Sequence, residues 1–163
     1  ILGLLSEIID SFHTVDSLNV GLPLGNLTSQ LLVNIYMNEF DQYAKRVLKV
    51  RYYIRYADDF VIFSKNMKFL KELISEIAKF LEYRLRLELH PKKVSIKTYE
   101  SGVDFLGWVN FPTHRLLRTS TKLRMFRNLE KEMNDAILAS YIGFLKHGNT
   151  HDLMCKILEA KSK

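Results

Sequence analysis

Cysteine is almost missing from this chain, since Cys155 is the one cysteine among its 163 residues. A lone cysteine cannot build an internal disulfide framework, and no cysteine and histidine spacing typical of a zinc site accompanies it. The sequence therefore argues against a disulfide-stapled secreted domain and a zinc module. It favours a reducing, intracellular setting.

Long apolar runs are also missing. No stretch approaches the roughly 20 apolar residues that a membrane-spanning helix needs, and no charged-then-apolar leader with a small-residue cleavage site is visible. The chain begins at Ile1 rather than at a methionine. We interpret that beginning as a cut through a longer protein.

Apolar and basic residues, in contrast, are plentiful. With 47% hydrophobic and 12% aromatic residues, the chain can bury one sizeable core, and its length suits a single domain or one and a half. The net charge of +6 favours an anionic partner, nucleic acid before membrane, although proteins without such partners can be equally basic.

Two adjacent aspartates stand between two strand-like runs at residues 51–64, RYYIRYADDFVIFS. Bulky β-formers alternate with arginines before them and an apolar run follows, so the pattern predicts a hairpin with Asp58 and Asp59 at its tip. Tight hairpins usually recruit glycine, which is absent here. Neighbouring carboxylates repel unless they are solvated or share a cation such as Mg²⁺. A metal-binding tip and a solvated turn both remain open, because aspartate is common in turns.

Helical periodicity surrounds this hairpin. Apolar spacing predicts helices over residues 27–48, capped by Asn26 or Thr28, and over residues 67–83, and a later stripe over residues 123–137. Shorter helical pieces follow from Tyr141 and from Asp152.

Further alternating patterns predict short strands at residues 84–89, 94–99, 103–111 and 115–118, the last two as arms of one hairpin. The order of elements predicts an α+β fold, with antiparallel strands backed by helices and a helical segment after them. We place the boundary between the two parts at residue 120.

Basic residues gather on and before the first helix of the second part. They are interrupted among acids only by Glu130, and they comprise Arg115, Arg118, Lys122, Arg124, Arg127 and Lys131. Such a stripe is either a solvated helix face or a contact surface for phosphates.

Three segments occur in a telling order: GLPLGNLTSQ at residues 21–30, RYADDF at 55–60 and VDFLGW at 103–108. Together with the lysine-bearing LELHPKKVSI, they resemble the palm domain of reverse transcriptases. The resemblance implies an antiparallel palm sheet backed by helices over residues 1–119 and a partial helical thumb over 120–163. It further implies an RNA-directed DNA polymerase that uses an RNA template, a DNA primer, deoxynucleotides and two Mg²⁺ ions.

The first of these segments is similar to that of diversity-generating retroelements, whose enzymes copy a template RNA with errors at adenines. Intron-type relatives carry glutamine where this chain has Leu24, and they have serine-proline where it has Ser29 and Gln30. This similarity implies a bacterial, cytoplasmic enzyme and a basic accessory protein as a partner.

The resemblance also assigns roles to residues. Asp58 is the expected direct metal ligand, with Asp59 as a second ligand or an electrostatic contributor, and Lys93, or else Lys92, matches a proton donor near the pyrophosphate. The nucleotide and template pocket comprises Leu24, Gly25, Asn26, Ser29 and Gln30. The primer grip comprises Phe105, Leu106, Gly107 and Trp108, although Trp108 also suits a core. Contacts with the nucleic-acid backbone are expected from Arg118, Lys122, Arg124 and Arg127.

One element of the family is missing from the sequence. Its first palm motif supplies another essential aspartate on a strand, yet Asp10 lies in a helical pattern and Asp16 in a loop. We expect that aspartate, and the fingers segment, upstream of Ile1. Residues 1–163 alone are then not expected to polymerise or to show a fully occupied metal pair.

Two other classes compete. A Walker-type ATPase also has a strand ending in aspartates, but no G-x-x-x-x-G-K-[ST] loop occurs here. A non-catalytic RNA-recognition module has a similar helix-backed sheet, but its aromatic strand signature is absent and paired aspartates would repel phosphates without a metal.

Overall fold

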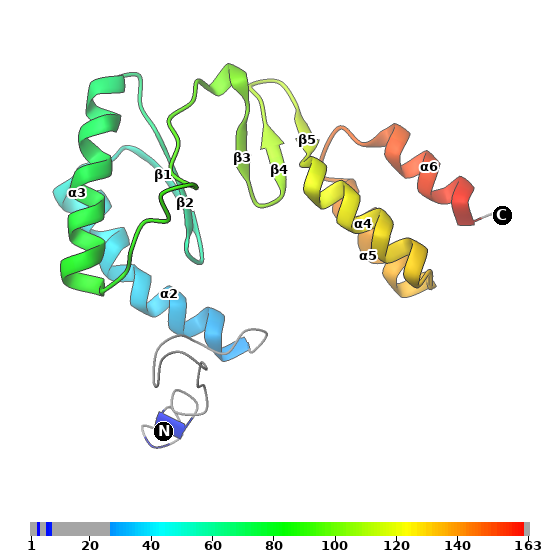
Figure 1. The fold of residues 1–163 in the computed structure, drawn as a ribbon, viewed down its shortest axis with the longest axis horizontal. Coiled ribbons are helices and arrows are strands. Elements are labelled where there is room, and N and C mark those ends of the chain that lie inside the picture. The colour runs from blue at the N-terminus through cyan, green and yellow to red at the C-terminus, as the bar shows by residue number, and fades with distance from the viewer. Residues whose placement is uncertain (1–2, 4–5, 8–26, 162–163) are drawn as a thin grey trace. The chain divides into compact units, whose positions relative to one another are not determined.

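The structure is a computed structural model that describes residues 3, 6–7 and 27–161. Its elements are helices and two small antiparallel sheets, which confirms the predicted α+β class (Figure 1). The chain divides into two compact units, Ile1–Val94 and Ser95–Lys163. The functional division into palm and thumb at residue 120 stays a prediction.

Over residues 27–85, the first unit consists of two α-helices, a short π-helical turn and one hairpin. Helix α2 covers Leu27–Gln42 and continues into the short π-helical turn η1, Tyr43–Val47; strands β1, Tyr52–Tyr56, and β2, Asp59–Phe63, form the hairpin; and α3 covers Met67–Leu85. The helices predicted at residues 27–48 and 67–83 and the two strands of the hairpin are therefore confirmed. Thr28 lies inside α2 rather than at its cap.

Local signals explain where α3 begins and ends. The Asn66 side chain caps it by accepting a hydrogen bond from the Phe69 N–H at 3.1 Å, and Arg86 ends it in a left-handed conformation. The buried residues Leu73, Ile77, Leu81 and Leu85 recur every four positions and form the face that packs into the core.

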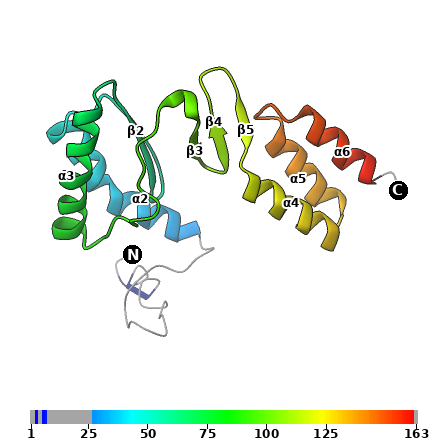
Figure 2. The same ribbon diagram turned by 45° about the horizontal axis from the view of Figure 1, so that its top comes forward.

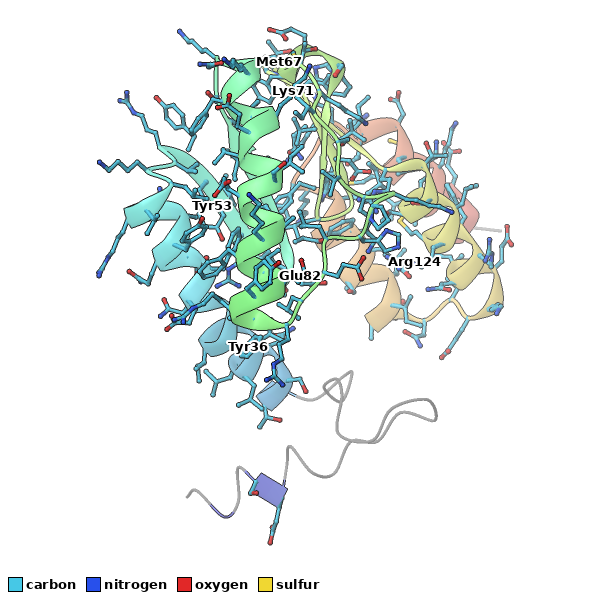
Figure 3. The ribbon with its side chains drawn as sticks, turned by 60° about the vertical axis from the view of Figure 1, so that its left-hand side comes forward. Tyr36, Tyr53, Met67, Lys71, Glu82 and Arg124 are labelled. Carbon is cyan, nitrogen blue, oxygen red and sulfur yellow. The ribbon has the colours of Figure 1, made fainter. Side chains whose placement is uncertain are left out.

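The core of this unit is aromatic at its centre. Phe40 is fully buried on α2, and the rings of Tyr53, Phe60 and Phe80 lie 4.9 to 6.2 Å from it. Figure 3 shows Tyr36 at the C-terminal end of α3, where its hydroxyl donates to the Leu85 carbonyl. These contacts hold α2, α3 and the hairpin together.

The second unit begins with the 3-10 turn η2, Tyr99–Ser101, and a three-stranded antiparallel sheet in the order β3-β4-β5. The strands are Val103–Phe105, Trp108–Asn110 and Arg115–Leu117. Helices α4, Thr119–Lys131, α5, Asp135–Leu145, and α6, His151–Lys161, follow and lie side by side (Figure 2). Their shared core comprises Met125, Leu129, Leu138, Leu145, Leu153 and Ile157.

The strands predicted at residues 84–89 and 94–99 are wrong. Helix α3 extends through Leu85, and residues 87–98 form turns and irregular chain. Leu81 and Leu85 are both buried in the helical core, so the 3.6-residue period prevails over the short alternation that follows. Most side chains of residues 90–99 are exposed, so no buried face sets a strand register there.

Two further elements divide where the sequence predicted continuity. The strand predicted over residues 103–111 turns at Leu106 and Gly107, so it forms both β3 and β4, while the predicted return to residues 115–118 is confirmed as β5. The helix predicted over residues 123–137 ends at Lys131, because Asn134 caps α5 by accepting from the Ile137 N–H at 2.8 Å. None of the described helices combines the length and apolar composition needed to traverse a bilayer.

Candidate functional site

The β1–β2 hairpin closes through a two-residue turn. Tyr56 pairs with Asp59, so the turn consists of Ala57 and Asp58, and Asp59 is the first residue of β2. The prediction that both aspartates lie at the tip is therefore correct for Asp58 and wrong for Asp59. Ala57 has a φ of 51°, a left-handed conformation that costs a residue other than glycine about 1 to 2 kcal/mol.

The Arg55 guanidinium holds this strained turn against α2. Its Nε and Nη2 donate to the two carboxylate oxygens of Asp41 at 2.8 and 2.6 Å, a bidentate pair. Its Nη1 donates to the Ala57 carbonyl at 2.7 Å and to Asn34 Oδ1 at 3.1 Å. One side chain thus links two residues of the helix to the turn that carries Asp58.

Tyr53 completes this cluster, which we call the Asp41–Arg55 clamp (Asp41, Tyr53 and Arg55). The Tyr53 hydroxyl donates to Asp41 Oδ1 at 2.6 Å. Hydrogen bonding from Arg55 lowers the pKa of Asp41, while burial, followed by the bond to Asp41, raises the pKa of Tyr53. Asp41 is therefore charged and Tyr53 neutral at physiological pH.

Asp58 and Asp59 are both exposed. Asp59 lies opposite Tyr56 and hence on the open face of the hairpin, where Tyr52, Ile54 and Tyr56 are each 55% exposed; the clamp occupies the other face. Within the described chain, neither carboxylate forms an ion pair. The oxygens of both aspartates are thus accessible to a hard cation such as Mg²⁺, which prefers such ligands.

Two carboxylates alone do not complete a metal cage. Among the residues that the structure describes, no group of three histidine, cysteine, aspartate or glutamate side chains is close enough to hold a metal ion. The donor chemistry at the hairpin fits Mg²⁺, which usually keeps several waters and takes one or two carboxylates from the protein.

The predicted nucleotide pocket is only partly described. Leu24, Gly25 and Asn26 lie outside the described residues, whereas Ser29 is buried and Gln30 exposed on the first turn of α2. Lys92 and Lys93 are exposed in a turn that the Lys93 N–H closes by donating to the His90 carbonyl at 2.9 Å. Their predicted role stays a prediction.

The predicted primer grip forms the β3–β4 hairpin in the second unit. Phe105 pairs with Trp108, and the turn residues Leu106 and Gly107 have φ values of 54° and 82°, the two positive values of a type I′ turn. Trp108 is buried, with Phe144 at 5.0 Å between ring centroids. Trp108 therefore supports the hairpin from the core, and the exposed Leu106 is the side chain that the turn presents to solvent.

The four residues expected to contact nucleic-acid backbones do not form one surface. Arg118 pairs with Asp104, and its N–H donates to the Gly107 carbonyl at 2.9 Å, so it joins α4 to the β3–β4 turn. Arg124 and Arg127 are exposed, and their spacing of three places them on one face of α4. Lys122 is exposed on nearly the opposite side of the helix.

Sequence reasoning missed the Asp41–Arg55 clamp. The sequence did indicate that Arg55 points inward, because it alternates along β1 with the exposed residues Ile54 and Tyr56. A charged residue on the buried face of a strand requires a partner. The spacing in the sequence did not reveal that α2 supplies it.

Comparison with known proteins decides the family. The profile described as Reverse transcriptase (RNA-dependent DNA polymerase) matches residues 10–109. The chain belongs to this family. Protein YkfC of Escherichia coli (strain K12) is 31% identical over an alignment of 160 positions, and the match covers 77% of this chain and 40% of YkfC. The chain thus spans about two fifths of the length of that relative.

Proposed function

We propose that this chain forms the palm and partial thumb of an RNA-directed DNA polymerase, in which Asp58 and Asp59 bind the catalytic Mg²⁺ ions. The observation that carries the proposal is the clamped hairpin, which presents one exposed carboxylate on a turn fixed to a helix and a second at the first residue of β2. Membership of the reverse transcriptase family supports the same conclusion.

The proposed reaction joins a primer to a deoxynucleotide on an RNA template. The primer 3′ oxygen attacks the α-phosphorus, the bond to the pyrophosphate breaks, and the 3′ proton is lost. Mg²⁺ ions held by Asp58 and Asp59 would lower the pKa of the attacking hydroxyl and neutralise the leaving pyrophosphate.

Each group of predicted site residues has a part in this reaction. Asp58 and Asp59 orient the cations, and Lys93, or else Lys92, donates a proton to the pyrophosphate. The nucleotide pocket at residues 24–30 accepts the deoxynucleotide, and the β3–β4 turn positions the primer end. On α4, Arg124 and Arg127 contact the backbone of the duplex.

The metal site needs a further carboxylate, which the family resemblance places on a strand outside these 163 residues. We therefore propose that residues 1–163 alone do not extend a primer. Error-prone copying of an RNA template and the need for a basic accessory protein rest on Ser29 and Gln30 only, and both stay predictions.

Primer extension by the full-length protein tests the proposal. Asp58→Ala should lower the rate about a thousandfold, equivalent to about 4 kcal/mol of lost transition-state stabilisation, because the direct metal ligand is removed. Asp152→Ala on α6 is the matched control, since its side chain is fully exposed. Unchanged extension by the Asp58→Ala protein would refute the assignment. Nucleic-acid binding without any extension by the wild type would instead favour a non-catalytic binding module.

A further inference from the structure

A pocket of about 390 Å³ lies within the second unit, between the β4–β5 turn and the loop that joins α5 to α6. Two hydrogen bonds connect its walls across 34 residues of sequence. The Asn149 N–H donates to the Arg115 carbonyl at 3.0 Å, and the Asn149 side-chain oxygen accepts from the Arg115 N–H at 3.3 Å. The loop therefore continues the edge of β5 and is fixed to it.

Packing against Trp108 and a buried hydrogen bond also hold the α5–α6 loop in place. A Cβ on Gly148 would lie 2.1 Å from an atom of the Trp108 ring, so the loop approaches the tryptophan as closely as only glycine permits. The Thr150 hydroxyl, which is buried, donates to the Leu145 carbonyl at 2.6 Å. The pocket is thus formed before any ligand arrives, which lowers the entropic cost of binding.

The lining carries positive charge and aromatic rings. Arg115 and Lys146 contribute two cations, and no acidic residue occurs among the described residues that line the pocket. The Arg115 guanidinium lies over the Trp108 ring, 5.4 Å from its centroid, and this contact orients the arginine side chain. Within the described chain, neither cation belongs to an ion pair, so both can neutralise a ligand.

A stacked pair of rings forms one side. The Phe111 and His114 rings lie 4.6 Å apart and only 12° from parallel. Phe111 packs over Gly102, where an added Cβ would meet its ring at 2.9 Å, whereas His114 is exposed. The outward ring of the stack is therefore His114, an aromatic surface beside two cations.

We propose that this pocket binds one nucleotide unit of a single-stranded nucleic acid, with its phosphate on Arg115 and Lys146 and its base against His114. Planar rings beside cations are the chemistry that single strands use, because their bases are free to stack, whereas duplex bases are not. The inference rests on the proposed function only for the choice of nucleic acid over other polyanions.

Fluorescence anisotropy with a labelled 12-nucleotide single strand tests it in the full-length protein, without deoxynucleotides or Mg²⁺. Arg115→Gln combined with Lys146→Gln should weaken binding at least about tenfold and reduce the salt slope by about 0.7 for each phosphate that the protein no longer neutralises. The control, Lys68→Gln with Lys156→Gln, removes the same charge from exposed sites and should change affinity less than about threefold. Equal losses in both proteins would overturn the proposal, as would unchanged binding in the pocket variant.

The aromatic side has its own test. His114→Ala should weaken single-strand binding by about fivefold or more and leave duplex binding unchanged, with His151→Ala as the control. In the 163-residue chain, Trp108 is the one tryptophan, so its emission should change on titration with the single strand and not with inorganic phosphate. A response to phosphate alone would indicate a simple anion site and overturn the proposal.

The two proposals fail separately. Asp58→Ala should bind the single strand as the wild type does, because the aspartate is outside the pocket. Loss of extension with intact pocket binding supports both. Intact extension with no pocket binding refutes only the pocket.

Discussion

The β1–β2 and β3–β4 hairpins both close through two residues, and in each a residue other than glycine takes a positive φ, Ala57 at 51° and Leu106 at 54°. Each also has an arginine paired with an aspartate close to its turn. The turns nevertheless draw their stability from different sources.

In the β1–β2 hairpin the support comes from a helix. Arg55 reaches Asp41 of α2 and the Ala57 carbonyl with the same guanidinium, and the paired side chains are only 9% and 28% exposed. In the β3–β4 hairpin, Gly107 relieves the second turn position, and the side chains of Arg118 and Asp104 are each 42% exposed. The comparison teaches that the carboxylate-bearing turn is fixed by a partly buried side-chain network that reaches α2, whereas the β3–β4 turn is fixed by a glycine at its second position, the Arg118 N–H and the buried Trp108.

The two arginines provide the largest expected difference. Arg55→Met should lower the free energy of unfolding of the first unit by about 2 to 4 kcal/mol, because it leaves the partly buried Asp41 carboxylate with Tyr53 as its remaining clamp partner. Arg118→Met should cost the second unit less than about 1 kcal/mol, since its pair is exposed to solvent. In urea unfolding, circular dichroism follows both units and Trp108 fluorescence follows the second, so the first unit is measured by the transition that circular dichroism alone detects.

Equal losses in the two variants would remove the distinction between the hairpins. Asp41→Asn is the companion variant for Arg55→Met. Because both residues belong to one network, their effects should not add, and a double-mutant cycle should give a coupling of about 1 kcal/mol or more.

The second expected difference between the hairpins is that pH should affect the stability of the first unit through the Asp41–Arg55 clamp. The pKa of Asp41 is lowered in the folded state by Arg55, so its contribution is present above the unfolded value of about 4 and is lost as pH falls below it. The pKa of Tyr53 is raised, chiefly by burial, so its contribution is present below about pH 10 and is lost as pH rises further.

Tyr53→Phe checks the alkaline half of this expectation. It should cost about 1 to 2 kcal/mol at neutral pH through the lost bond to Asp41, and it should abolish the loss of stability above about pH 10 that this tyrosine causes. Tyr43→Phe, in the same core, is a suitable control. An unchanged alkaline profile in Tyr53→Phe would contradict the role given to Tyr53.

Substitutions of the turn residues themselves should cause the smallest changes in stability, and the two hairpins should respond with opposite signs. Ala57→Gly should stabilise the first unit by up to about 1 kcal/mol, since glycine accepts a positive φ without strain. Gly107→Ala should destabilise the second unit by about 1 kcal/mol, because its φ is 82° and the new Cβ would lie 3.2 Å from the Thr121 hydroxyl oxygen. Thermal unfolding measures the stability change in each variant. Changes of the same sign would contradict the strain assigned to Ala57 and the need for glycine at position 107.

Much of the fold was predictable because its signals are local. The α3 face of Leu73, Ile77 and Leu81 follows a 3.6-residue period, and the strands around Asp58 follow the alternation of β1 and the apolar run of β2. The end of one helix before Asn134 also had a signal in the sequence, because asparagine is a common N-cap and caps α5 here. The apolar stripe that continues past Asn134 nevertheless predicted one unbroken helix.

The candidate site was predictable in its residues but not in its geometry. The order of the three motifs in the sequence indicated the family and singled out Asp58 and Asp59. It did not place Asp59 in β2, because the length of a turn depends on the register that the paired strands adopt. Nor did it distinguish Trp108 as a buried residue from Leu106 as an exposed one.

By itself, the sequence determined the secondary-structure elements near the hairpin, the α+β class and the family, since these depend on periodicity and on motifs that are contiguous. Only the tertiary structure decided that Arg55 joins Asp41 to the Ala57 carbonyl, and that Asn149 binds the backbone of Arg115. Both arrangements connect residues 14 and 34 positions apart, so they depend on how helices and strands pack rather than on any local pattern.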